Sequence, residues 1–328
     1  MSTMRNSRRQ EILDSWQGNN IFIFGGACML GPDLKALGCT FFLVSVPVAL
    51  FTVTVGIKLG KSISWAFEVV VILWYLGTMY SLTATATTDP GVVPRGLEQA
   101  EPLQSTTNQP LTKEYHINGR VVKTKYCFTC NTYRPPRCSH CRVCDNCVEK
   151  FDHHCPWVGT CIGKRNYRHF FLFISLSSSL CVVSFASSVT VIVKEHCDGA
   201  TFWDSLGQNA PAAIIAVYCF VMFWFVGGLT AFHTYLLGTN QTTYEHFRAN
   251  YNEDRVNPYD VGVAGNCRQA LGAPTSRRAS SWTRESCPGS KLPSPTRRAA
   301  RFSRRSARTG RTCSRGRESR GSPLPERS

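Results

Sequence analysis

The chain of 328 residues carries a formal net charge of +16 and contains 16 cysteines. Residues 268–328 hold 16 Lys/Arg against 3 Asp/Glu, so the other 267 residues hold 21 basic against 18 acidic side chains. Because the body of the chain is nearly neutral, its charge argues against a nucleic-acid partner, and its long apolar blocks argue against a soluble globular protein.

A polar N-terminal segment, residues 1–35, precedes four apolar blocks. The blocks lie at 36–57, 63–86, 170–193 and 210–237. Each reaches the roughly 20 residues that a helix needs to cross a bilayer core, whereas helices of soluble proteins seldom stay apolar on every face for this length. The first block is too long for the apolar region of a cleaved signal peptide, so we expect an uncleaved anchor. The sequence predicts an α-helical polytopic membrane protein with four transmembrane helices.

Two ionisable residues lie near the ends of these blocks, Glu68 in the second and His233 in the fourth. At such positions a polar side chain can reach the membrane interface. We therefore expect neither of them to have a catalytic role.

The distribution of basic residues predicts the orientation of the spans. The segment 87–169 contains twelve Lys/Arg, whereas the connection 194–209 contains one Lys and three acidic residues. Basic segments near span ends favour the cytosolic side. Both termini and segment 87–169 are therefore expected in the cytosol.

Segment 127–161 lies in this cytosolic region and holds eight cysteines and three histidines. Cys127 and Cys130 form one Cys-x-x-Cys pair, and Cys141 and Cys144 form another, a spacing that lets two thiolates bind one tetrahedral zinc. Each pair needs two further ligands, and the candidates are His140, Cys147, His154 and Cys161. The spacing does not fix which residues share a metal. A redox role for the pairs would call for a thioredoxin-like pattern of strands and helices, which the sequence lacks.

Two zinc ions need eight ligands, so three of the eleven Cys and His side chains are left over. The segment ends in the tetrapeptide Asp152 to Cys155, followed by Pro156-Trp157 and, further on, Asn166-Tyr167. The run 126–171 closely resembles the DHHC cysteine-rich domain of integral-membrane protein S-acyltransferases, the palmitoyltransferases.

Motifs outside this run support the resemblance, which covers about residues 8–272. Asp89-Pro90-Gly91 resembles the family's Asp-Pro-Gly motif, and Thr242-Thr243-Tyr244-Glu245 resembles its Thr-Thr-x-Glu motif. Asn257-Pro258-Tyr259 resembles the start of the C-terminal element, here 238–272, that packs near the active site. The sequences 134–137 and 164–167 are most similar to the branch that includes Golgi Ras palmitoyltransferases.

The resemblance implies a ligand set for each of two structural zinc ions. One zinc would be bound by Cys127, Cys130, His140 and Cys147, and the other by Cys141, Cys144, His154 and Cys161. The residues left over are then Cys138, His153 and Cys155. We expect Cys138 to be a spare or packing residue, since both zinc sites are full without it.

The remaining side chains suit nucleophilic catalysis. Cys155 is the expected nucleophile, His153 the general base that takes its proton, and Asp152 the carboxylate that orients the imidazole. In an extended stretch His153 and Cys155 point to one side while His154 points to the other, towards the metal. The alternative is that His153 and Cys155 are spare ligands. By resemblance alone, Thr243 supports Asp152 and Asn257 caps backbone near the site.

The short distance from Cys161 to the third span places Cys155 close to the cytosolic membrane face. The expected reaction is acylation of Cys155 by palmitoyl-CoA, followed by transfer of the acyl group to a cysteine of a cytosolic or membrane-associated protein. Lys164, Arg165 and Arg168 are candidates for binding the CoA phosphates, or are simply basic flanks of the span.

The branch resemblance suggests Ras-like protein substrates, an accessory subunit and a Golgi or endoplasmic reticulum membrane. The basic tail 273–328 has the composition of a disordered segment, and is either a replaceable tail or a binder of anionic membrane lipid. The competing function is a non-catalytic, membrane-anchored zinc module that resembles a ubiquitin ligase and uses every cysteine as a ligand.

Overall fold

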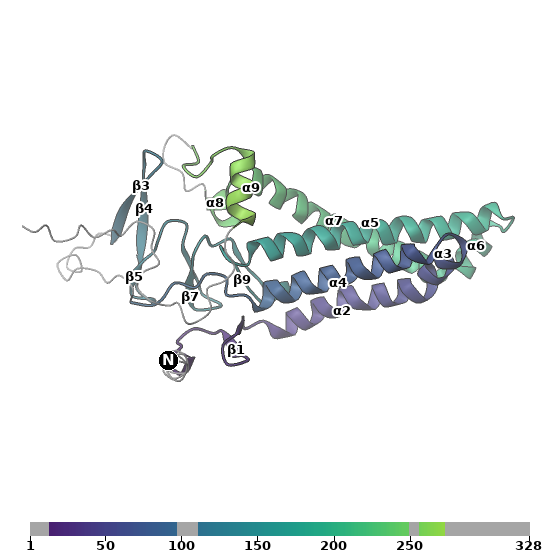
Figure 1. The fold of residues 1–328 in the computed structure, drawn as a ribbon, viewed down its shortest axis with the longest axis horizontal. Helices are drawn as coiled ribbons and strands as arrows, with labels where there is room; N and C mark the ends of the chain where they lie inside the picture. Colours follow the sequence, from purple (N-terminus) through teal and green to yellow (C-terminus); the bar gives the residue numbers. More distant parts are fainter. Residues whose placement is uncertain (1–12, 97–110, 249–255, 273–328) are drawn as a thin grey trace, which may run out of the picture. The chain divides into compact units, whose positions relative to one another are not determined.

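The computed structural model describes residues 13–96, 111–248 and 256–272, so the predicted tail 273–328 lies outside the described residues. Four helical segments are long and apolar enough to cross a membrane, as predicted. They are Leu34–Ser62, which comprises α2 (Leu34–Phe51), a π-helical stretch (Thr52–Gly56) and α3 (Ile57–Ser62), together with α4 (Trp65–Thr87), α5 (Tyr167–Cys197) and α7 (Ala210–Gly238). A short helix, α6 (Phe202–Gln208), connects α5 to α7. Figure 1 shows the four spans running side by side.

Several small polar side chains are buried inside the bundle beside large apolar ones such as Phe51 and Ile215, while many other large apolar side chains face outward. Thr78, Ser81 and Thr85 of α4 are buried, as are Ser184 and Ser188 of α5. The exposed apolar side chains include Val69, Leu73, Leu76, Val217, Phe220 and Phe225. Helices that pack in lipid show this distribution, because lipid tails solvate apolar side chains and small residues let helices approach closely. The predicted fold class is confirmed.

Glu68 differs from the expectation that its carboxylate reaches the membrane interface. The residue is 5% exposed, and neither carboxylate oxygen has a hydrogen-bond partner among the described residues. It lies against Gly56, at the end of the π-helical stretch, where an added Cβ would collide with Glu68 Oε2. A side chain at position 56 would therefore displace the Glu68 carboxylate from its present place.

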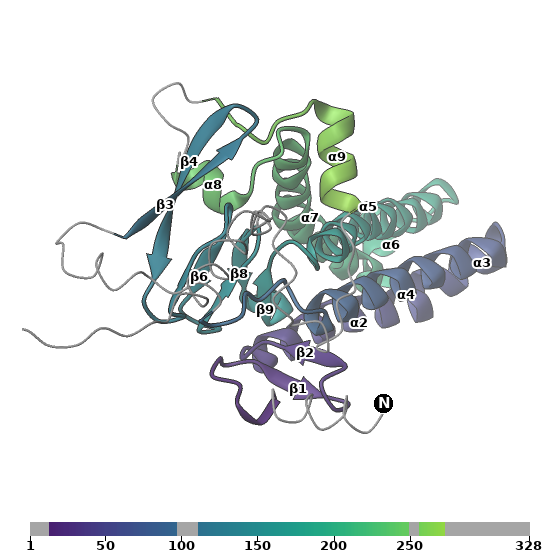
Figure 2. The same cartoon turned by 60° about the vertical axis from the view of Figure 1, so that its left-hand side comes forward.

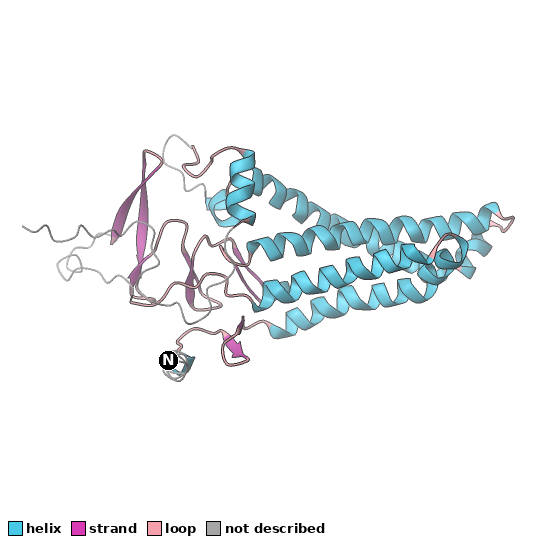
Figure 3. Ribbon diagram, viewed as in Figure 1, coloured by secondary structure: helices cyan, strands magenta, loops and turns pink. Residues whose placement is uncertain are grey.

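The cysteine-rich segment is built from short antiparallel strands, which gather at one end of the helices (Figure 3). β3 (Thr112–Ile117), β4 (Arg120–Cys127) and β5 (Thr132–Tyr133) form one sheet in that order, β6 (Ser139–Cys141) pairs with β7 (Asn146–Val148), and β8 (His153–Cys155) pairs with β9 (Thr160–Ile162). Strands of two or three residues cannot enclose a hydrophobic core of their own. Their positions therefore depend on the clusters of cysteine and histidine that they carry.

The N-terminal segment also packs on this region, through the hairpin of β1 (Ile21–Ile23) and β2 (Cys28–Leu30) (Figure 2). The Asn19 N–H donates to the Cys144 carbonyl at 2.9 Å, and the Asn146 side chain donates to Asn20 Oδ1 at 2.7 Å. The chain that enters the first span is thus fixed to the cysteine-rich segment.

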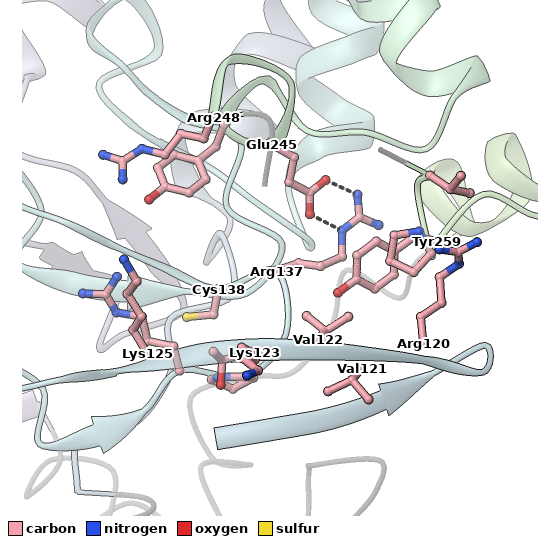
Figure 4. A pocket seen from close by; sticks show the side chains of 16 residues that line it. Arg120, Val121, Val122, Lys123, Lys125, Arg137, Cys138, Glu245, Arg248 and Tyr259 are labelled. Atoms are coloured by element: carbon pink, nitrogen blue, oxygen red, sulfur yellow. Dashed lines mark hydrogen bonds and ion pairs between the residues drawn. The ribbon is translucent and has the colours of Figure 1, made fainter. Parts of the chain in front are cut away.

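The chain that follows α7 also packs on the cysteine-rich segment. It forms α8 (Thr243–Arg248) and α9 (Val263–Leu271). Arg137, just before β6, makes two hydrogen bonds of 2.7 Å to the Glu245 carboxylate, and its guanidinium lies 4.3 Å from the centre of the Tyr259 ring (Figure 4). Asn257 donates to the Thr239 carbonyl at 2.6 Å, which matches the backbone-capping position expected for it. Asn266 also donates to the Gly238 carbonyl at 2.8 Å, so the C-terminal element contacts both the end of α7 and the cysteine-rich segment.

Asn166, at the start of α5, joins the cysteine-rich segment to the bundle. Its side chain accepts a hydrogen bond from the Gly163 N–H at 2.9 Å and donates to the carbonyls of Cys161 and Thr85 at 2.9 and 3.2 Å. The residue is fully buried, so a shorter side chain would leave these groups without water to replace the lost partners.

We predict that Asn166→Ala destabilises the protein by about 1–3 kcal/mol for each backbone group left unpaired. Thermal unfolding of the purified protein in detergent measures the change as a lower midpoint. Gln208→Ala, which removes an exposed amide near the other end of the bundle, is the control. An Asn166→Ala protein as stable as the control would contradict the anchoring role.

Candidate active site and metal centres

The structure gathers eight cysteine and histidine residues into two groups, each able to hold a metal ion. One group is Cys127, Cys130, His140 and Cys147, and the other is Cys141, Cys144, His154 and Cys161. In each group the ligand atoms all lie within 4.8 Å of one another. Three thiolates and one imidazole form the donor set of a closed tetrahedral zinc site, so the residues fit the metal. The grouping agrees with the one implied by the resemblance.

A carboxylate contacts the second ring nitrogen of each of these histidines. His154 Nδ1 faces the sulfur atoms of its group, and its Nε2 lies 2.6 Å from Asp33 Oδ2. In the other group, His140 Nε2 lies 3.4 Å from Asp145 Oδ1. Such carboxylates orient the ring of a ligating histidine. Sequence reasoning missed both acids, and nothing in the local sequence links Asp33, at the start of α2, to a histidine 121 residues later.

Strand β8 separates the metal ligand from its two neighbours. His154 and Cys161 are paired across the β8–β9 ladder, and both belong to the second metal group. Because side chains alternate along a strand, His153 and Cys155 project to the face opposite His154. Gly159 allows the tight turn back to β9, since its φ of +78° is disfavoured for other residues.

Cys155 lies where the cysteine-rich segment meets the membrane helices. It is 8% exposed and belongs to an apolar cluster. The cluster draws on α2, α4 and α5 and includes Leu37, Leu82, Ala86, Phe170, Phe173 and Ile174. The thiol therefore borders the apolar interior of the bundle.

Asp152 is buried beside His153 and is held by the chain that follows α7. The Thr243 N–H donates to Asp152 Oδ1 at 3.0 Å, and the Thr243 hydroxyl donates to Oδ2 at 2.8 Å. His153 Nδ1 lies 3.5 Å from Oδ2. The structure thus brings the four predicted residues Asp152, His153, Cys155 and Thr243 to one place, although Thr243 is 91 residues from Asp152.

The electrostatic surroundings favour a proton on His153. Burial alone would lower the pKa of His153, but hydrogen bonds to Asp152 and Cys155 raise it to about 9. Burial would raise the pKa of Asp152, but hydrogen bonds to His153 and Thr243 hold it below its usual range. His153 is therefore a base strong enough to accept a thiol proton.

The Thr-Thr-x-Glu motif has a physical explanation at the start of α8. The Glu245 carboxylate accepts from the Thr242 N–H at 2.9 Å, and the Thr242 hydroxyl accepts from the Glu245 N–H at 3.1 Å. This reciprocal pair is a capping box. It fixes the turn that presents Thr243 to Asp152, while Glu245 also binds Arg137.

His233 occupies a position that sequence reasoning did not foresee. It is 1% exposed, and one of its ring nitrogens lies within 4.8 Å of a carboxylate oxygen of Asp152 and a ring nitrogen of His153. Its Nδ1 lies 3.2 Å from the Tyr167 hydroxyl. The His233 side chain is therefore buried against other side chains near the end of its span. Its place near one end of an apolar block gave no sign of these contacts, because the partners come from other elements.

The three candidate phosphate-binding residues each contact a different neighbouring side chain. Lys164 Nζ lies 2.8 Å from Glu149 Oε2, and Arg165 is paired with Asp89. Arg168 contacts the neighbouring His169 at 3.5 Å. None of the three lines the cationic cavity of about 330 Å³ that lies between β4 and α8 (Figure 4). The basic residues of that cavity are Arg120, Lys123, Lys125, Arg134, Arg137 and Arg248.

Cys138 belongs to neither metal group. It packs against the first group, beside Cys127, Cys130 and Cys147, and its side chain lines the cationic cavity. This position agrees with the packing role expected for it.

Comparison with known proteins agrees with the geometry. The family model for the DHHC palmitoyltransferase matches residues 121–250. Protein S-acyltransferase 8 of Arabidopsis thaliana is 44% identical over 277 residues, an alignment that covers 78% of this chain and 68% of the relative. Probable protein S-acyltransferase 7 of the same plant is 42% identical, with 79% of this chain and 62% of the relative covered.

The residues matched by the family model include both metal groups, the tetrapeptide Asp152 to Cys155, and the spans α5 and α7. The chain belongs to the DHHC palmitoyltransferase family.

Proposed function

We propose that this protein is a protein S-palmitoyltransferase in which Cys155 carries the acyl group. The observation that supports it most strongly is the position of Cys155, between the apolar cluster of three membrane helices and the Asp152–His153 pair. A fatty acyl chain can remain among apolar side chains while its thioester carbonyl meets the thiol. A membrane-anchored zinc module without catalysis would have no use for this arrangement.

In the first step, His153 takes the proton of Cys155 and the thiolate attacks the thioester carbonyl of palmitoyl-CoA. The bond from the carbonyl carbon to the CoA sulfur breaks, and the CoA sulfur leaves with the proton returned by His153. Asp152 holds the imidazole and stabilises its charged form, while the two Thr243 donors hold Asp152. Cys155 is left as an S-acyl thioester.

In the second step, the thiolate of a substrate cysteine attacks the acyl carbonyl and Cys155 is released as thiolate. We place this reaction on the cytosolic side, because the basic segments of the chain flank the end of the bundle that carries Cys155. On the strength of the branch resemblance, the proposal also includes Ras-like lipid-modified proteins as substrates, an accessory subunit, and a location in a Golgi or endoplasmic reticulum membrane. Anionic membrane lipid is a proposed partner of the tail.

The two metal groups would hold structural zinc. Each supplies four protein ligands, which leaves no position for water or substrate. The metal in the second group would fix His154 and Cys161, and with them the strand that presents Cys155.

The CoA phosphates remain assigned to Lys164, Arg165 and Arg168. The support for this assignment is their place near the site: Lys164 and Arg165 lie between β9 and α5, and Arg168 lies in the first turn of α5. Lys164 and Arg165 already pair with Glu149 and Asp89, so a bound phosphate would have to compete with these carboxylates.

The first prediction concerns the nucleophile. Cys155→Ser should take no hydroxylamine-sensitive label from radiolabelled palmitoyl-CoA and should still contain two zinc equivalents. Cys138→Ser is the matched control, because it removes a thiol of the same segment that belongs to neither metal group; it should be labelled like the wild type. Wild-type protein that never becomes labelled would refute the proposed function.

A second prediction separates the two neighbouring histidines. His153→Ala should slow acylation of Cys155 by about 10²- to 10⁴-fold, the usual contribution of a general base, and should keep both metals. His154→Ala should lose one zinc equivalent. Rapid-quench labelling and metal analysis of the same samples measure both properties. Loss of zinc from His153→Ala, with His154→Ala still loaded, would mean that the two roles have been exchanged.

A third prediction concerns Asp33. Asp33→Asn should weaken metal binding at the second group by about 10- to 100-fold, because the His154 ring loses the carboxylate that orients it. Competition with a chromophoric chelator measures the affinity. Asp198→Asn, at an exposed acid at the far end of α5, is the control. Unchanged chelator competition would show that Asp33 does not support the metal site.

A further inference from the structure

The hydrogen bond between His153 and Asp152 is too long to fix the orientation of the His153 ring by itself. Its Nδ1 lies 3.5 Å from Asp152 Oδ2, at the outer limit for a hydrogen bond, whereas Thr243 donates to the same carboxylate at 2.8 and 3.0 Å. The His153 side chain is also 27% exposed. Besides Asp152 and Cys155, the rings beside His153 therefore also contribute to its orientation. These are Phe170, whose centroid is 5.3 Å away, and His233, at 5.9 Å.

His233 is held firmly from its other side. Its Nδ1 lies 3.2 Å from the Tyr167 hydroxyl, and the edges of Phe170 and Phe232 pack at centroid distances of 5.0 and 5.7 Å. Tyr167 opens α5 and His233 lies in the last third of α7. The contact between Tyr167 and His233 therefore joins α5 to α7 close to the catalytic strand. His233 reaches the site from two helices that are held together.

The chemistry of the ring gives His233 a second use. When the Tyr167 hydroxyl donates to Nδ1, the ring proton resides on Nε2, the nitrogen two bonds away across the ring. A His233 nitrogen lies within 4.8 Å of both an Asp152 oxygen and a His153 nitrogen. No hydrogen bond joins His233 to Asp152 in the described structure, so this N–H would act on the nearby carboxylate as a polar group, in addition to the two donors of Thr243.

Resting on the acyltransferase function proposed above, we propose that His233, held by Tyr167, is a positioning residue that keeps the Asp152 carboxylate and the His153 ring aligned for proton transfer from Cys155. A displacement of about 1 Å in such a site can slow a reaction about 10²-fold, so this alignment has a measurable effect on rate.

Two amide substitutions test which ring nitrogen matters. The Gln side chain places its amide near the Nε2 position, and the Asn side chain places its amide near the Nδ1 position. His233→Gln should therefore keep a donor towards Asp152 and retain most of the acylation rate, whereas His233→Asn should keep only the contact to Tyr167 and acylate Cys155 about 10- to 100-fold more slowly. The loss should appear in the rate at saturating palmitoyl-CoA and leave the KM nearly unchanged.

Tyr167→Phe should slow acylation in the same direction but less. Combined with His233→Asn it should add little further loss, because residues that act through one another are not additive. His196→Asn, at an exposed histidine in the last turn of α5, is the control and should acylate normally. All variants should keep two zinc equivalents and a normal unfolding temperature.

Other results would overturn the proposal in distinguishable ways. Normal acylation by His233→Asn would remove the role while leaving the acyltransferase function intact. Equal loss in the Gln and Asn variants, accompanied by a lower unfolding temperature, would show a purely structural residue. A wild type with three metal equivalents and a His233→Asn variant with two would make His233 a metal ligand beside Asp152 and His153. A wild type that takes no label would refute the acyltransferase function and this role together.

Discussion

Strand β8 is the element on which the site depends, because the alternation of side chains along a strand forces adjacent residues to opposite faces. His154 faces three thiolates on one side, and His153 and Cys155 face the membrane helices on the other. The three residues of β8 thus include both a metal ligand, His154, and the thiol of Cys155. The short strands around them bury few apolar side chains, so the metal groups and the ladder to β9 help to fix the backbone that presents the thiol.

The helix bundle also helps to position the catalytic residues. Asn166 joins β9 and the last turn of α4 to the start of α5, so hydrogen bonds connect the cysteine-rich segment directly to two membrane helices. The apolar cluster around Cys155 comes from three helices, which gives an acyl chain a place next to the thiol. Asp33, at the entrance to α2, contacts His154 and so connects the first span to the second metal group.

The chain after α7 returns to complete the site. The capping box of Thr242 and Glu245 sets the first turn of α8, from which Thr243 donates twice to Asp152. The ion pair between Arg137 and Glu245 is almost fully buried, with side chains 9% and 8% exposed. A buried, bidentate pair of this kind fixes relative position firmly, since breaking it would leave an uncompensated charge. The carboxylate that orients His153 is therefore placed by residues about 90 positions away in the sequence.

Length and apolar composition were enough to predict the four spans, because a bilayer demands about 20 apolar residues for each helix. Spacing was enough to recognise two metal-binding pairs, and the excess of ligands marked the tetrapeptide that ends in Cys155. Spacing did not show which four ligands share each metal. The family resemblance implied the two sets, and the fold brings the same sets together.

The contacts of Asp33, Glu68 and His233 could not be predicted from the sequence. Each is a polar residue at or near the end of an apolar block, where the local pattern is compatible with simple exposure at the interface. Asp33 and His233 contact residues distant in the chain, and Glu68 lies against Gly56 of the first span, so tertiary packing brings these groups together. The sequence by itself thus determined which chemical groups are present and which segments enter the membrane, because these follow from local composition and spacing. The tertiary structure decided which groups meet, because that depends on how the four helices and the returning C-terminal chain pack.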